Sequence, residues 1–526
     1  MPGPAAQSFR PAYNPWVIAF TVTIATFMEV LDTSIANVAL PHIAGGLAAS
    51  EDEATWVLTS YLVSNAVVLP ISAWISGRIG RKRFYMSCVA LFTLSSALCG
   101  IAPTLPWLIL FRVLQGVGGG GLAPSEQAIL ADTFPPAQRG MAFAMYGLAV
   151  VLAPAIGPTL GGFIVDHASW RWIFYINVPV GFISLFLSSM VVEDPPWLKE
   201  ERERMRQVRV DRLGLALVAV GFGSLQYVMD KGQEVDWFSS PTIVVFTMAA
   251  VIGLSGTVIW EWAHPEPVVN VRLFRNGNFA VSVGLMFTLG AVLYATTVLI
   301  PLFLQTLMGY SAEGAGEVMS LGGFVTMAMM PLAGFLVSRV AAKYLIAGAF
   351  AALSLALIHM SGLSLDIDAH TAAMYRVYQA FALAFLFIPI NTVAYLGVPR
   401  EQNNQVSGLM NLARNIGGSV GISFFSTMLA RRSQTFQNLL VGHVTPSNPI
   451  AQERLARLAR GFAASGPAEA HQRALAALYA TVGRQAALLS YVKILQDLIV
   501  VCVLFVPLIL LLVKRNDPAA APAGAH

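Results

Sequence analysis

Two carboxylates lie inside the first long apolar stretch of the chain. Glu29 and Asp32 are three residues apart, so a helix would place them on roughly the same face. Ionisable side chains at membrane depth are costly and mark substrate, ion or proton pathways. Burial disfavours a charged carboxylate, whereas a neighbouring guanidinium favours it. A conformational change that alters either influence would change the proton affinity of these acids, which is the chemistry that proton-coupled transport requires.

Arg112, in the fourth apolar stretch, is the expected partner of Asp32. At about 1.5 Å per residue, Asp32 lies about 12 Å and Arg112 about 9 Å below the same outer edge. The similar depths predict an ion pair or a shared water network. Because arginine stays charged, it would bias the proton affinity of its partner without titrating itself. Both proton coupling and a static salt bridge between two helices are consistent with this pattern.

The second half of the chain carries further charged and polar residues at membrane depth. Glu317 and Arg376 lie at depths comparable to those of the acids and the arginine of the first half, so Glu317 is a further candidate for proton coupling. Arg414 lies near the middle of a later stretch, and its partner is not evident from the sequence. The candidates for a substrate cavity are Arg376, Arg414, Asn411, Asn415 and Tyr294.

Small residues and prolines are interspersed in the fifth apolar stretch, over residues 153–162. Residues four apart stack on one helical face, so Gly157 and Gly161 would let a neighbouring backbone approach closely. Pro154 and Pro158 each remove a donor from the helix ladder and are expected to bend the helix. We therefore predict a conformational seam that consists of Gly157, Pro158, Gly161 and Gly162.

The composition requires a membrane protein. Of the 526 residues, 56% are hydrophobic and only 11% are charged, with a mean hydropathy of +0.66. Apolar runs of about 20 residues can each cross a hydrocarbon core about 30 Å thick. The chain is therefore predicted to be an all-α polytopic membrane protein, whose first span is too long and too acidic for a cleavable signal. The fourteen candidate spans lie at about 15–40, 54–76, 84–102, 106–131, 138–165, 172–192, 211–230, 240–262, 277–303, 311–338, 342–363, 371–397, 402–430 and 488–513.

Basic residues alternate between loops, and this alternation predicts the orientation. Loops of one parity carry basic residues such as those of 78–83 and 199–212, whereas the short loops of the other parity carry only Arg171 and Lys231. By the positive-inside rule, both termini are predicted to be cytoplasmic, with the chain in the cytoplasmic (inner) membrane. The small net charge of +4 reflects this topology, so nucleic acid is not an expected partner.

Two segments of the first half recur in the second half in the same order. Residues 111–116 resemble 375–380, and residues 156–161 resemble 416–421. This predicts a duplicated six-helix unit, as in transporters built from repeats around a central cavity. The predicted organisation is a cytoplasmic N-terminus (1–14), an N-terminal six-helix bundle (15–192), a cytoplasmic linker (193–212), two inserted transmembrane helices (213–262), a C-terminal six-helix bundle (277–513) with a long periplasmic loop (431–487), and a cytoplasmic tail (514–526).

Two regions outside the spans have helical periodicity. Residues 199–212 mix Glu and Arg at helical spacing, which indicates a surface helix or a regulatory site. Residues 452–463 and 468–487, in the long loop, suggest short amphipathic helices. These helices would form a folded cap or a docking surface for an extracytoplasmic partner, and both interpretations stand.

The sequence offers no constellation for catalysis or for metal binding. The eight histidines are scattered, and neither a His-Glu-x-x-His motif nor a Gly-x-Ser-x-Gly nucleophile turn with its partners occurs. Residues 118–121 are all glycine but are not followed by Gly-Lys-Ser/Thr, so a phosphate loop is not expected. Cys88, Cys99 and Cys502 lie in spans and imply no disulfide framework. We therefore expect no enzyme, and no catalytic residue, cofactor or metal.

Taken together, these motifs resemble the major facilitator superfamily, and within it the fourteen-helix drug:proton antiporters of the EmrB/QacA type. The resemblance covers nearly the whole chain and implies the major facilitator fold, with two six-helix bundles plus two additional transmembrane helices. The segments that carry it are the first-helix motif (Leu31–Pro41), the end of the loop between helices two and three (Arg78–Arg83), the fourth-helix arginine motif (Leu110–Gly121), the fifth-helix antiporter motif (Ala153–Gly162) and the entry into helix six (Trp170–Pro179).

The chain departs from the family pattern in one cytoplasmic loop. Gly77 and Ala73 stand where the family usually has an acid and a glycine. In the family, this acid is thought to help latch the two bundles together on the cytoplasmic side. The latch is therefore expected to be weaker in this chain or to use other residues. The loop motif that remains comprises Arg78, Gly80, Arg81 and Lys82.

The resemblance implies a proton-coupled antiporter that exports amphipathic drugs or related toxic compounds by alternating access. The alternative is a proton-driven exporter of one specific endogenous metabolite, such as a siderophore, a fatty acid or a biosynthetic product. The implied partners are the substrate, protons, membrane lipid and, as for some relatives, a periplasmic adaptor protein and an outer-membrane channel. Aromatic and methionine side chains of the spans would either line an apolar cavity or face the lipid and the protein core. They include Tyr61, Phe174, Tyr294, Met327, Met329 and Tyr395.

Overall fold

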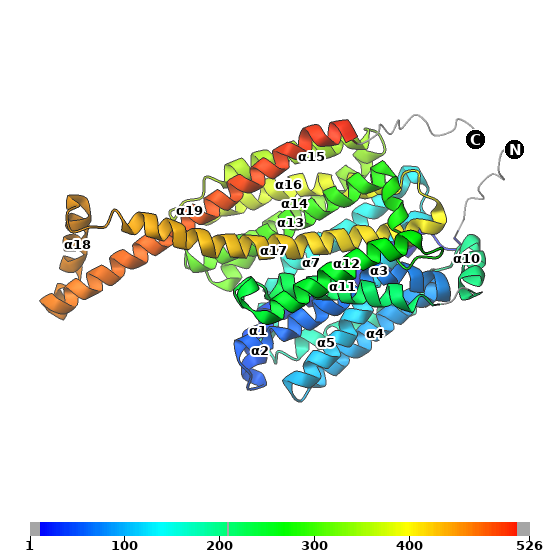
Figure 1. Cartoon of the computed structure of the whole chain (residues 1–526), viewed down its shortest axis with the longest axis horizontal. Helices are drawn as coiled ribbons and strands as arrows, with labels where there is room; N and C mark the ends of the chain where they lie inside the picture. Colours follow the sequence, from blue (N-terminus) through cyan, green and yellow to red (C-terminus); the bar gives the residue numbers. More distant parts are fainter. Residues whose placement is uncertain (1–10, 208–209, 513–526) are drawn as a thin grey trace.

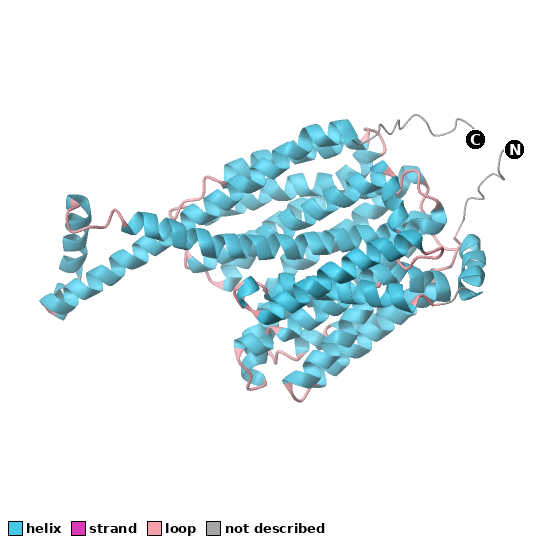
Figure 2. Cartoon of the chain, viewed as in Figure 1, coloured by secondary structure: helices cyan, strands magenta, loops and turns pink. Residues whose placement is uncertain are grey.

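The computed structural model describes residues 11–207 and 210–512. Helices account for most of this part of the chain, and no strand occurs among the described residues (Figure 2). The all-α prediction is therefore confirmed. The predicted tail (514–526) and most of the predicted N-terminal segment (1–14) lie outside the described residues.

The helices of the first half begin where the chain offers a cap or a proline. The Asn14 side chain accepts a hydrogen bond from Trp16 N at 2.9 Å, and a proline occupies the first turn of α1, α5 and α7. The predicted fourth span is divided into α5 and α6 around Gly120 and Gly121. The helices are α1 (Pro15–Gly46), α2 (Glu51–Ala54), α3 (Trp56–Ile79), α4 (Arg81–Ile101), α5 (Leu105–Gly119), α6 (Leu122–Thr133), α7 (Pro136–His167), α8 (Trp172–Tyr175) and α9 (Asn177–Val191).

Several of the helices that follow begin with a polar cap. Asp211, Asn276, Ser311 and Asp368 each accept a backbone hydrogen bond at the start of a helix. The helices are α10 (Pro196–Gln207), α11 (Arg212–Lys231), α12 (Pro241–Ala263), α13 (Gly277–Thr306), α14 (Ala312–Val337), α15 (Ala342–Met360), α16 (Ala369–Ala394), α17 (Asn403–Val441), α18 (Pro449–Gly461) and α19 (Pro467–Leu512), with short 3-10 turns at Trp237–Ser239, Val271–Arg275, Arg400–Gln402 and Ala463–Ser465.

Twelve described helices are long and apolar enough to cross a membrane, or thirteen if the two parts of a bent helix form one span. The predicted span at 402–430 is not among them. That region is α17, which is helical throughout but carries polar side chains, including Asn403, Asn411 and Arg414. These three side chains are buried, and polar groups are tolerated at membrane depth when they face protein instead of lipid. A hydropathy test therefore misses this helix.

The two halves of the chain lie side by side (Figure 1). Within the first half, α1 packs on α7 and α9, and within the second half α13 packs on α16 and α17. The halves meet where α7 packs along α14 and where α17 packs on α3 and α6. Helices α11 and α12 pack on each other, and α11 also contacts α3 and α17. The predicted arrangement of two helix bundles with an inserted pair is therefore confirmed.

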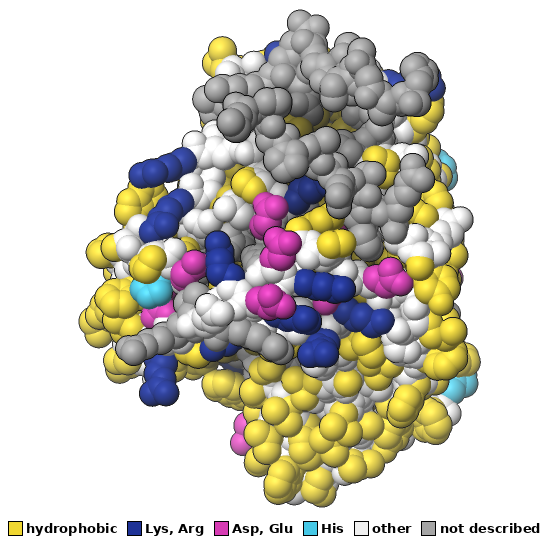
Figure 3. Space-filling model, turned by 90° about the vertical axis from the view of Figure 1, so that its right-hand side faces the viewer, with side chains coloured by type: hydrophobic (Ala, Val, Ile, Leu, Met, Phe, Trp, Pro, Cys, Tyr) yellow, Lys and Arg dark blue, Asp and Glu magenta, His cyan; other side chains and the backbone are white. Residues whose placement is uncertain are grey.

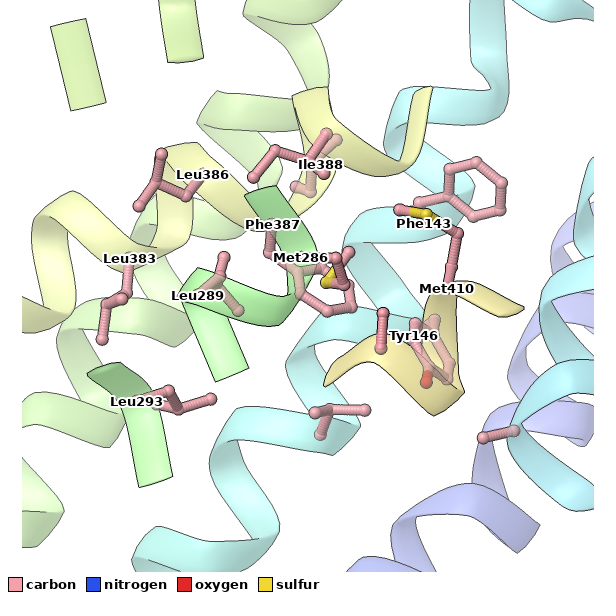
Figure 4. Packing of buried hydrophobic residues seen from close by; sticks show 14 of the residues in the cluster. Phe143, Tyr146, Met286, Leu289, Leu293, Leu383, Leu386, Phe387, Ile388 and Met410 are labelled. Atoms are coloured by element: carbon pink, nitrogen blue, oxygen red, sulfur yellow. The ribbon is translucent and has the colours of Figure 1, made fainter. Parts of the chain in front are cut away.

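Buried apolar side chains fill the contact between the halves (Figure 4). The Tyr146 ring of α7 stacks on Phe387 of α16 with 5.7 Å between centroids, and Phe143 of α7 stacks on Tyr395 at 5.4 Å. Met410 of α17 belongs to the same cluster. Because lipid tails are as apolar as these side chains, close packing stabilises the contact, rather than the exclusion of water.

Helix α7 bends by 43° after Pro154, as its prolines predict. Gly157 lies directly against Ser34 of α1, and a Cβ at Gly161 would lie 3.2 Å from the nearest α1 side chain. A Cβ at Gly162, by contrast, would meet nothing within 4 Å. Two members of the predicted seam therefore bring α7 close to α1 of the same half, and Gly162 is not part of that contact.

The loop predicted at 431–487 is wrong at both of its ends, although one of its predicted short helices is present. Helix α17 continues to Val441 and α19 already begins at Pro467, so both run out of the bundle as a paired extension (Figure 1). No glycine or proline interrupts residues 422–441, so nothing in the sequence stops α17. We call residues 431–487 the stalk.

Helix α18 packs against α19 in the stalk, with Leu455, Ala474 and Leu478 buried between them. It corresponds to the predicted helix at 452–463. The predicted short helix at 468–487 is instead the outer part of α19, a single helix of 46 residues.

The end of the bundle opposite the stalk carries α10, and we call it the α10 end (Figure 1). Figure 3 looks onto this end, where Lys and Arg side chains gather together with acidic ones and apolar side chains surround them. Helix α10 confirms the predicted surface helix in the linker, up to Gln207.

Candidate functional site

Asp32 on α1 and Arg112 on α5 form an ion pair inside the first half. Arg112 Nη1 lies 2.6 Å from Asp32 Oδ2, and both side chains are buried. The other carboxylate oxygen accepts hydrogen bonds from Gln115 Nε2 at 3.0 Å and from Asn177 Nδ2 at 2.7 Å. The predicted ion pair is therefore confirmed, and the carboxyl group has a donor at each of its oxygens.

Arg112 is itself held by several groups. Its Nε donates to Val57 O at 3.0 Å, and its Nη1 donates to Gln115 Oε1 at 2.8 Å. The guanidinium also lies 4.4 Å from the centroid of the Tyr61 ring, within cation–π range. Because Gln115 follows Arg112 by one turn, the Arg-x-x-Gln sequence directs both side chains to the same carboxylate. The pair connects α1, α3, α5 and, through Asn177, α9.

Glu29 lies about one turn away from Asp32 along α1, and its hydrogen-bond donors are neutral. Its Oε1 accepts from Tyr61 Oη at 3.1 Å and from Asn65 Nδ2 at 3.2 Å, and the side chain is partly buried. Tyr61 and Asn65 are four residues apart on α3, which places them on one face. Arg414, on α17, is close enough to act on Glu29 electrostatically. Glu29 therefore faces the contact between the halves, whereas Asp32 faces the interior of the first half.

Arg414 begins a chain of hydrogen bonds that crosses between the halves. Arg414 Nη1 donates to Tyr146 Oη at 2.9 Å, and Tyr146 Oη donates to Asn411 Oδ1 at 2.7 Å. Asn411 Nδ2 donates to Gln127 Oε1 at 2.9 Å, and Asn415 Oδ1 lies 3.4 Å from Arg414 Nε. The structure thus brings three predicted cavity residues together. It also supplies the partner of the arginine, Tyr146, which the sequence does not reveal.

Tyr294, another cavity candidate, lies on α13. Its side chain is half-buried, with the ring directly against Gly418 of α17. It is close enough to Arg414 to act on that charge. Tyr294 therefore borders the same network from the second half.

The second half repeats the arginine but not the acid. Arg376 on α16 is buried; its Nη1 donates to Gln379 Oε1 at 2.8 Å, and its Nη2 lies 3.5 Å from Thr297 Oγ1. Gln379 Nε2 in turn donates to Thr296 Oγ1 at 2.7 Å. The partners of this Arg-x-x-Gln pair on α13 are therefore hydroxyls, where the first half has a carboxylate.

Glu317 does not pair with Arg376 within the part of the chain that the structure describes. Its side chain, on α14, is exposed. Gly322, five residues further along α14, is the residue that lies against Arg376. Five residues correspond to a rotation of about 140° around a helix, so Glu317 points away from the arginine. A similar depth in the membrane does not bring two residues together when they occupy different faces.

A second ion pair of the first half lies near the α10 end, beside the contact between the halves. Arg81 on α4 pairs with Asp132 on α6, and both side chains are buried. Asp132 Oδ1 also accepts from Asn403 Nδ2, on α17, at 2.7 Å. One residue further, Asn404 Nδ2 donates to Ser76 Oγ at 2.6 Å. Asp132 thus supplies a carboxylate that holds the halves together, although Gly77 replaces the acid of the loop motif.

The other residues of the loop motif contact their own half. Gly80 has a φ of +97°, which favours glycine. Lys82 N donates to Asp194 Oδ1 at 2.8 Å, and Lys82 Nζ donates to a backbone carbonyl of α9 at 2.7 Å. Arg78 lies 5.5 Å from the centroid of the Trp74 ring. These contacts fasten the connection between α3 and α4.

Glu126 is a buried acid that is absent from the sequence-based candidates. Glu126 on α6 is fully buried, and its Oε1 accepts a hydrogen bond from Thr23 Oγ1 of α1 at 2.7 Å. The sequence signal is the same as for Glu29, an acid within a predicted span. Neutral groups of the site, such as Gln115 and Asn177, carry no such signal, because their role depends on what they face.

The family of the chain follows from its fold, its charged interior and its sequence matches. Residues 22–422 match the family model of the Major Facilitator Superfamily. The chain belongs to this superfamily of membrane transporters, and it is a multi-pass inner-membrane protein, not an enzyme.

The relatives confirm the predicted EmrB/QacA type. The chain is 35% identical over 456 residues to the multidrug export protein EmrB of Escherichia coli strain K12, covering 86% of this chain and 88% of EmrB. It is 37% identical over 455 residues to EmrB of Haemophilus influenzae, with the same two coverages. It is also 35% identical over 448 residues to the fatty acid resistance protein FarB of Neisseria gonorrhoeae, covering 85% of this chain and 86% of FarB.

Solved structures agree on the fold. The proton:xylose symporter XylE aligns over 91% of this chain and 95% of its own, with a TM-score of 0.57 and 16% identity. The human organic anion transporter MFSD10 aligns over 79% of this chain and 94% of its own, with a TM-score of 0.56 and 13% identity. The predicted major facilitator fold is therefore confirmed.

Proposed function

We propose that this chain exports amphipathic drugs or related toxic compounds across the inner membrane in exchange for protons, by alternating access. The names of relatives at 35–37% identity support the export of drugs. The observation that carries the proposal is the pair of acids on α1, Asp32 and Glu29. One is buried in an ion pair and the other faces the contact between the halves.

The orientation is part of the proposal. The α10 end, which carries the Lys and Arg side chains seen in Figure 3, would face the cytoplasm, and the stalk would face the periplasm. Both termini would then be cytoplasmic. The halves are joined near the α10 end by Asp132, Asn403 and Asn404, so in this orientation the described conformation would be closed toward the cytoplasm.

Proton coupling would proceed through a change in the surroundings of the acids. In the described conformation, Glu29 accepts hydrogen bonds from two neutral donors and faces Arg414 across the contact. A relative movement of the halves would change that distance and admit water. Glu29 would then exchange its proton with one side of the membrane, and Arg112 would keep Asp32 in place meanwhile. Export of substrate and entry of protons would share this movement.

The stalk supports a further element of the proposal, a periplasmic adaptor protein that leads to an outer-membrane channel. Ile450 and Tyr479 are exposed on it, with 75% and 63% of their surface accessible. The other proposed partners are the substrate, protons and membrane lipid, and nucleic acid is not among them.

A second candidate function is the proton-driven export of one specific endogenous metabolite. The similarity to a fatty acid resistance protein favours a fatty acid as that compound, over a siderophore or another biosynthetic product. A comparison of several unrelated cationic dyes with a fluorescent fatty acid separates the two functions. Transport of the fatty acid alone would replace the drug-export proposal.

The decisive experiment uses the purified full chain in proteoliposomes with an imposed pH gradient and ethidium as the fluorescent probe. We expect gradient-driven ethidium uptake in inside-out oriented transporters, lost in Asp32→Asn and strongly reduced in Arg112→Ala. Glu261→Gln is the matched control, because Glu261 is fully buried in α12, away from both acids. Uptake that ignores the gradient refutes proton coupling, and uptake that persists in both variants refutes the need for the Asp32–Arg112 pair.

A further inference from the structure

Glu126, unlike the buried Asp32 and Asp132, has no positively charged partner among the described residues. Its Oε1 accepts one hydrogen bond, from the Thr23 hydroxyl, and its Oε2 has no hydrogen-bond partner among the described residues. The side chain is 0% exposed. Asp32, by contrast, is bound by a guanidinium and two amides. An unpaired buried carboxylate is costly, and uptake of a proton removes that cost.

We propose that Glu126 is a second proton-exchanging carboxyl group of the transport cycle, and that Glu29 and Glu126 exchange protons while Asp32 mainly positions Arg112. This inference rests on the proposed proton-coupled function. It assigns the coupling to particular atoms, the carboxyl oxygens of Glu126.

Helix α1 carries polar groups at successive levels between Asp32 and Glu126, each turned by about 60° from the one before it. Asp32, Glu29, Thr26 and Thr23 are spaced by three residues, or about 4.5 Å along the axis at each step. Thr23 binds Glu126, and Thr26 presents a second buried hydroxyl near the same carboxyl group. Glu126 therefore lies at the level of Thr23, about 14 Å from Asp32 toward the α10 end.

The residues beside Glu126 on α6 take part in the contact between the halves. Its neighbour Gln127 is bonded to Asn411 at 2.9 Å and to Asn391 at 3.4 Å, both in the second half. Two residues before it, Pro124 O accepts from Ser407 Oγ of α17 at 2.8 Å. Separation of the halves at this level would break these bonds and expose α6. Glu126 would then gain or lose its proton according to which conformation the transporter adopts.

The charged and titratable groups around Glu126 allow this exchange. Glu29 on α1, Tyr85 on α4 and Tyr146 on α7 are close enough to act on it electrostatically. None of them is a cation. On α17, Arg414 donates to Tyr146, and the Arg81 guanidinium on α4 is bound to Asp132. Both arginines are therefore engaged elsewhere.

The proton balance is simple. In the described conformation, closed toward the α10 end, Glu126 holds a proton on one carboxyl oxygen. When the halves separate at that end, water reaches the carboxyl group, the O–H bond breaks, and the proton passes to water on that side. The carboxylate that remains is stabilised by hydration until the halves close again and a proton is taken up by way of Glu29.

The test compares Glu126→Gln with wild type in proteoliposomes, with ethidium as probe and two readouts. The first is uptake driven by a pH gradient, and the second is exchange of ethidium across the membrane without a gradient. We expect Glu126→Gln to reduce gradient-driven uptake at least about tenfold while exchange stays within about twofold of wild type. Glu126→Asp, which keeps a titratable group, should recover at least part of the gradient response.

Glu261→Gln is the matched control, since Glu261 is also fully buried with one oxygen that lacks a partner among the described residues. It should behave as wild type in both readouts. A normal gradient response in Glu126→Gln overturns the role of Glu126 alone. Parallel loss of both readouts in Glu126→Gln and Glu126→Asp also overturns it, because the side chain is then structural. If ethidium uptake by the wild-type protein does not depend on the pH gradient, the proposed function itself is overturned.

Discussion

The two halves of the molecule contain the same Arg-x-x-Gln pair in different surroundings. In the first half, Arg112 and Gln115 both bind the carboxylate of Asp32. In the second half, Arg376 and Gln379 meet the hydroxyls of α13 instead. The helical scaffold is duplicated, but the carboxylate of this site is not. Halves with a similar fold and a similar arginine motif can therefore differ in the charge of the groups around that arginine.

The same asymmetry recurs near the α10 end. The loop between α3 and α4 provides Arg81, which pairs with the buried Asp132. In the corresponding loop of the second half, after α14, Arg339 lies over the Phe335 ring at 4.3 Å. The second half contributes Asn403 and Asn404, which are neutral, to the contact. The first half therefore holds the two buried ion pairs among the described residues, and the second half presents amides and one arginine, Arg414, to it.

Removing each arginine in turn should give the largest contrast between the halves. Arg112→Met leaves Asp32 buried without its cation, so we expect destabilisation by about 3–5 kcal/mol and loss of transport. Arg376→Met removes a charge that has no carboxylate beside it, and should leave stability within about 1 kcal/mol of wild type or raise it. Thermal unfolding in detergent measures both. Equal destabilisation by the two variants would refute the asymmetry.

A double variant separates charge from shape in the first half. Asp32→Asn combined with Arg112→Met removes both charges, so it should recover about 2 kcal/mol or more of the stability lost in Arg112→Met alone. Gradient-driven transport should remain absent. The measurement is a double-mutant cycle of unfolding in detergent. Strict additivity of the two single effects would show that the ion pair is not coupled.

The pair near the α10 end should be more sensitive than its counterpart in the second half. Asp132→Asn leaves Arg81 buried and unpaired, so we expect a loss of about 3 kcal/mol and easier opening at that end. Arg339→Ala removes only a cation–π contact, worth about 0.5–1 kcal/mol. Labelling of a cysteine placed at Ser407, on α17, should become faster in the Asp132 variant. Unchanged labelling there would argue against its role in closure.

The smallest effect is expected from making the second half resemble the first. Thr297→Asp would place a carboxylate near Arg376, whose Nη2 is 3.5 Å from the present hydroxyl. A charge-assisted hydrogen bond should then raise stability by about 1 kcal/mol. Transport should remain coupled through the first half. A fall in stability would mean that the surroundings of Arg376 do not accept a carboxylate.

The sequence was sufficient to predict features that are set by the position of a residue along its helix. Apolar run length predicts the helices, the two prolines predict the bend of α7, and depth along a helix predicts the pairing of Asp32 with Arg112. Depth fails for Glu317, because it does not specify which face of α14 the side chain occupies.

Features that depend on which faces of distant helices meet were not predictable. Tyr146 is an ordinary aromatic residue of an apolar stretch until α7 and α17 meet, and only then is it the partner of Arg414. The stalk escapes prediction for another reason. The polar residues after 430 end the membrane signal but not the helix, since helical hydrogen bonds continue equally well in water. The sequence could have identified Glu126 as an acid within a span, but it could not show that no cation pairs with Glu126 among the described residues.

The stalk would amplify movements of the second half, because it extends rigidly from two of its helices. Helices α17 and α19 continue into it without a break, so its tip must follow any rotation of the helices in the membrane. The outer part of α19, residues 467–487, forms a rod of about 30 Å at 1.5 Å per residue. A tilt of about 10° at its base would carry the far end through about 5 Å. A spectroscopic label on that end would report, from beyond the bilayer, a rocking motion that is only a few ångströms wide at its pivot.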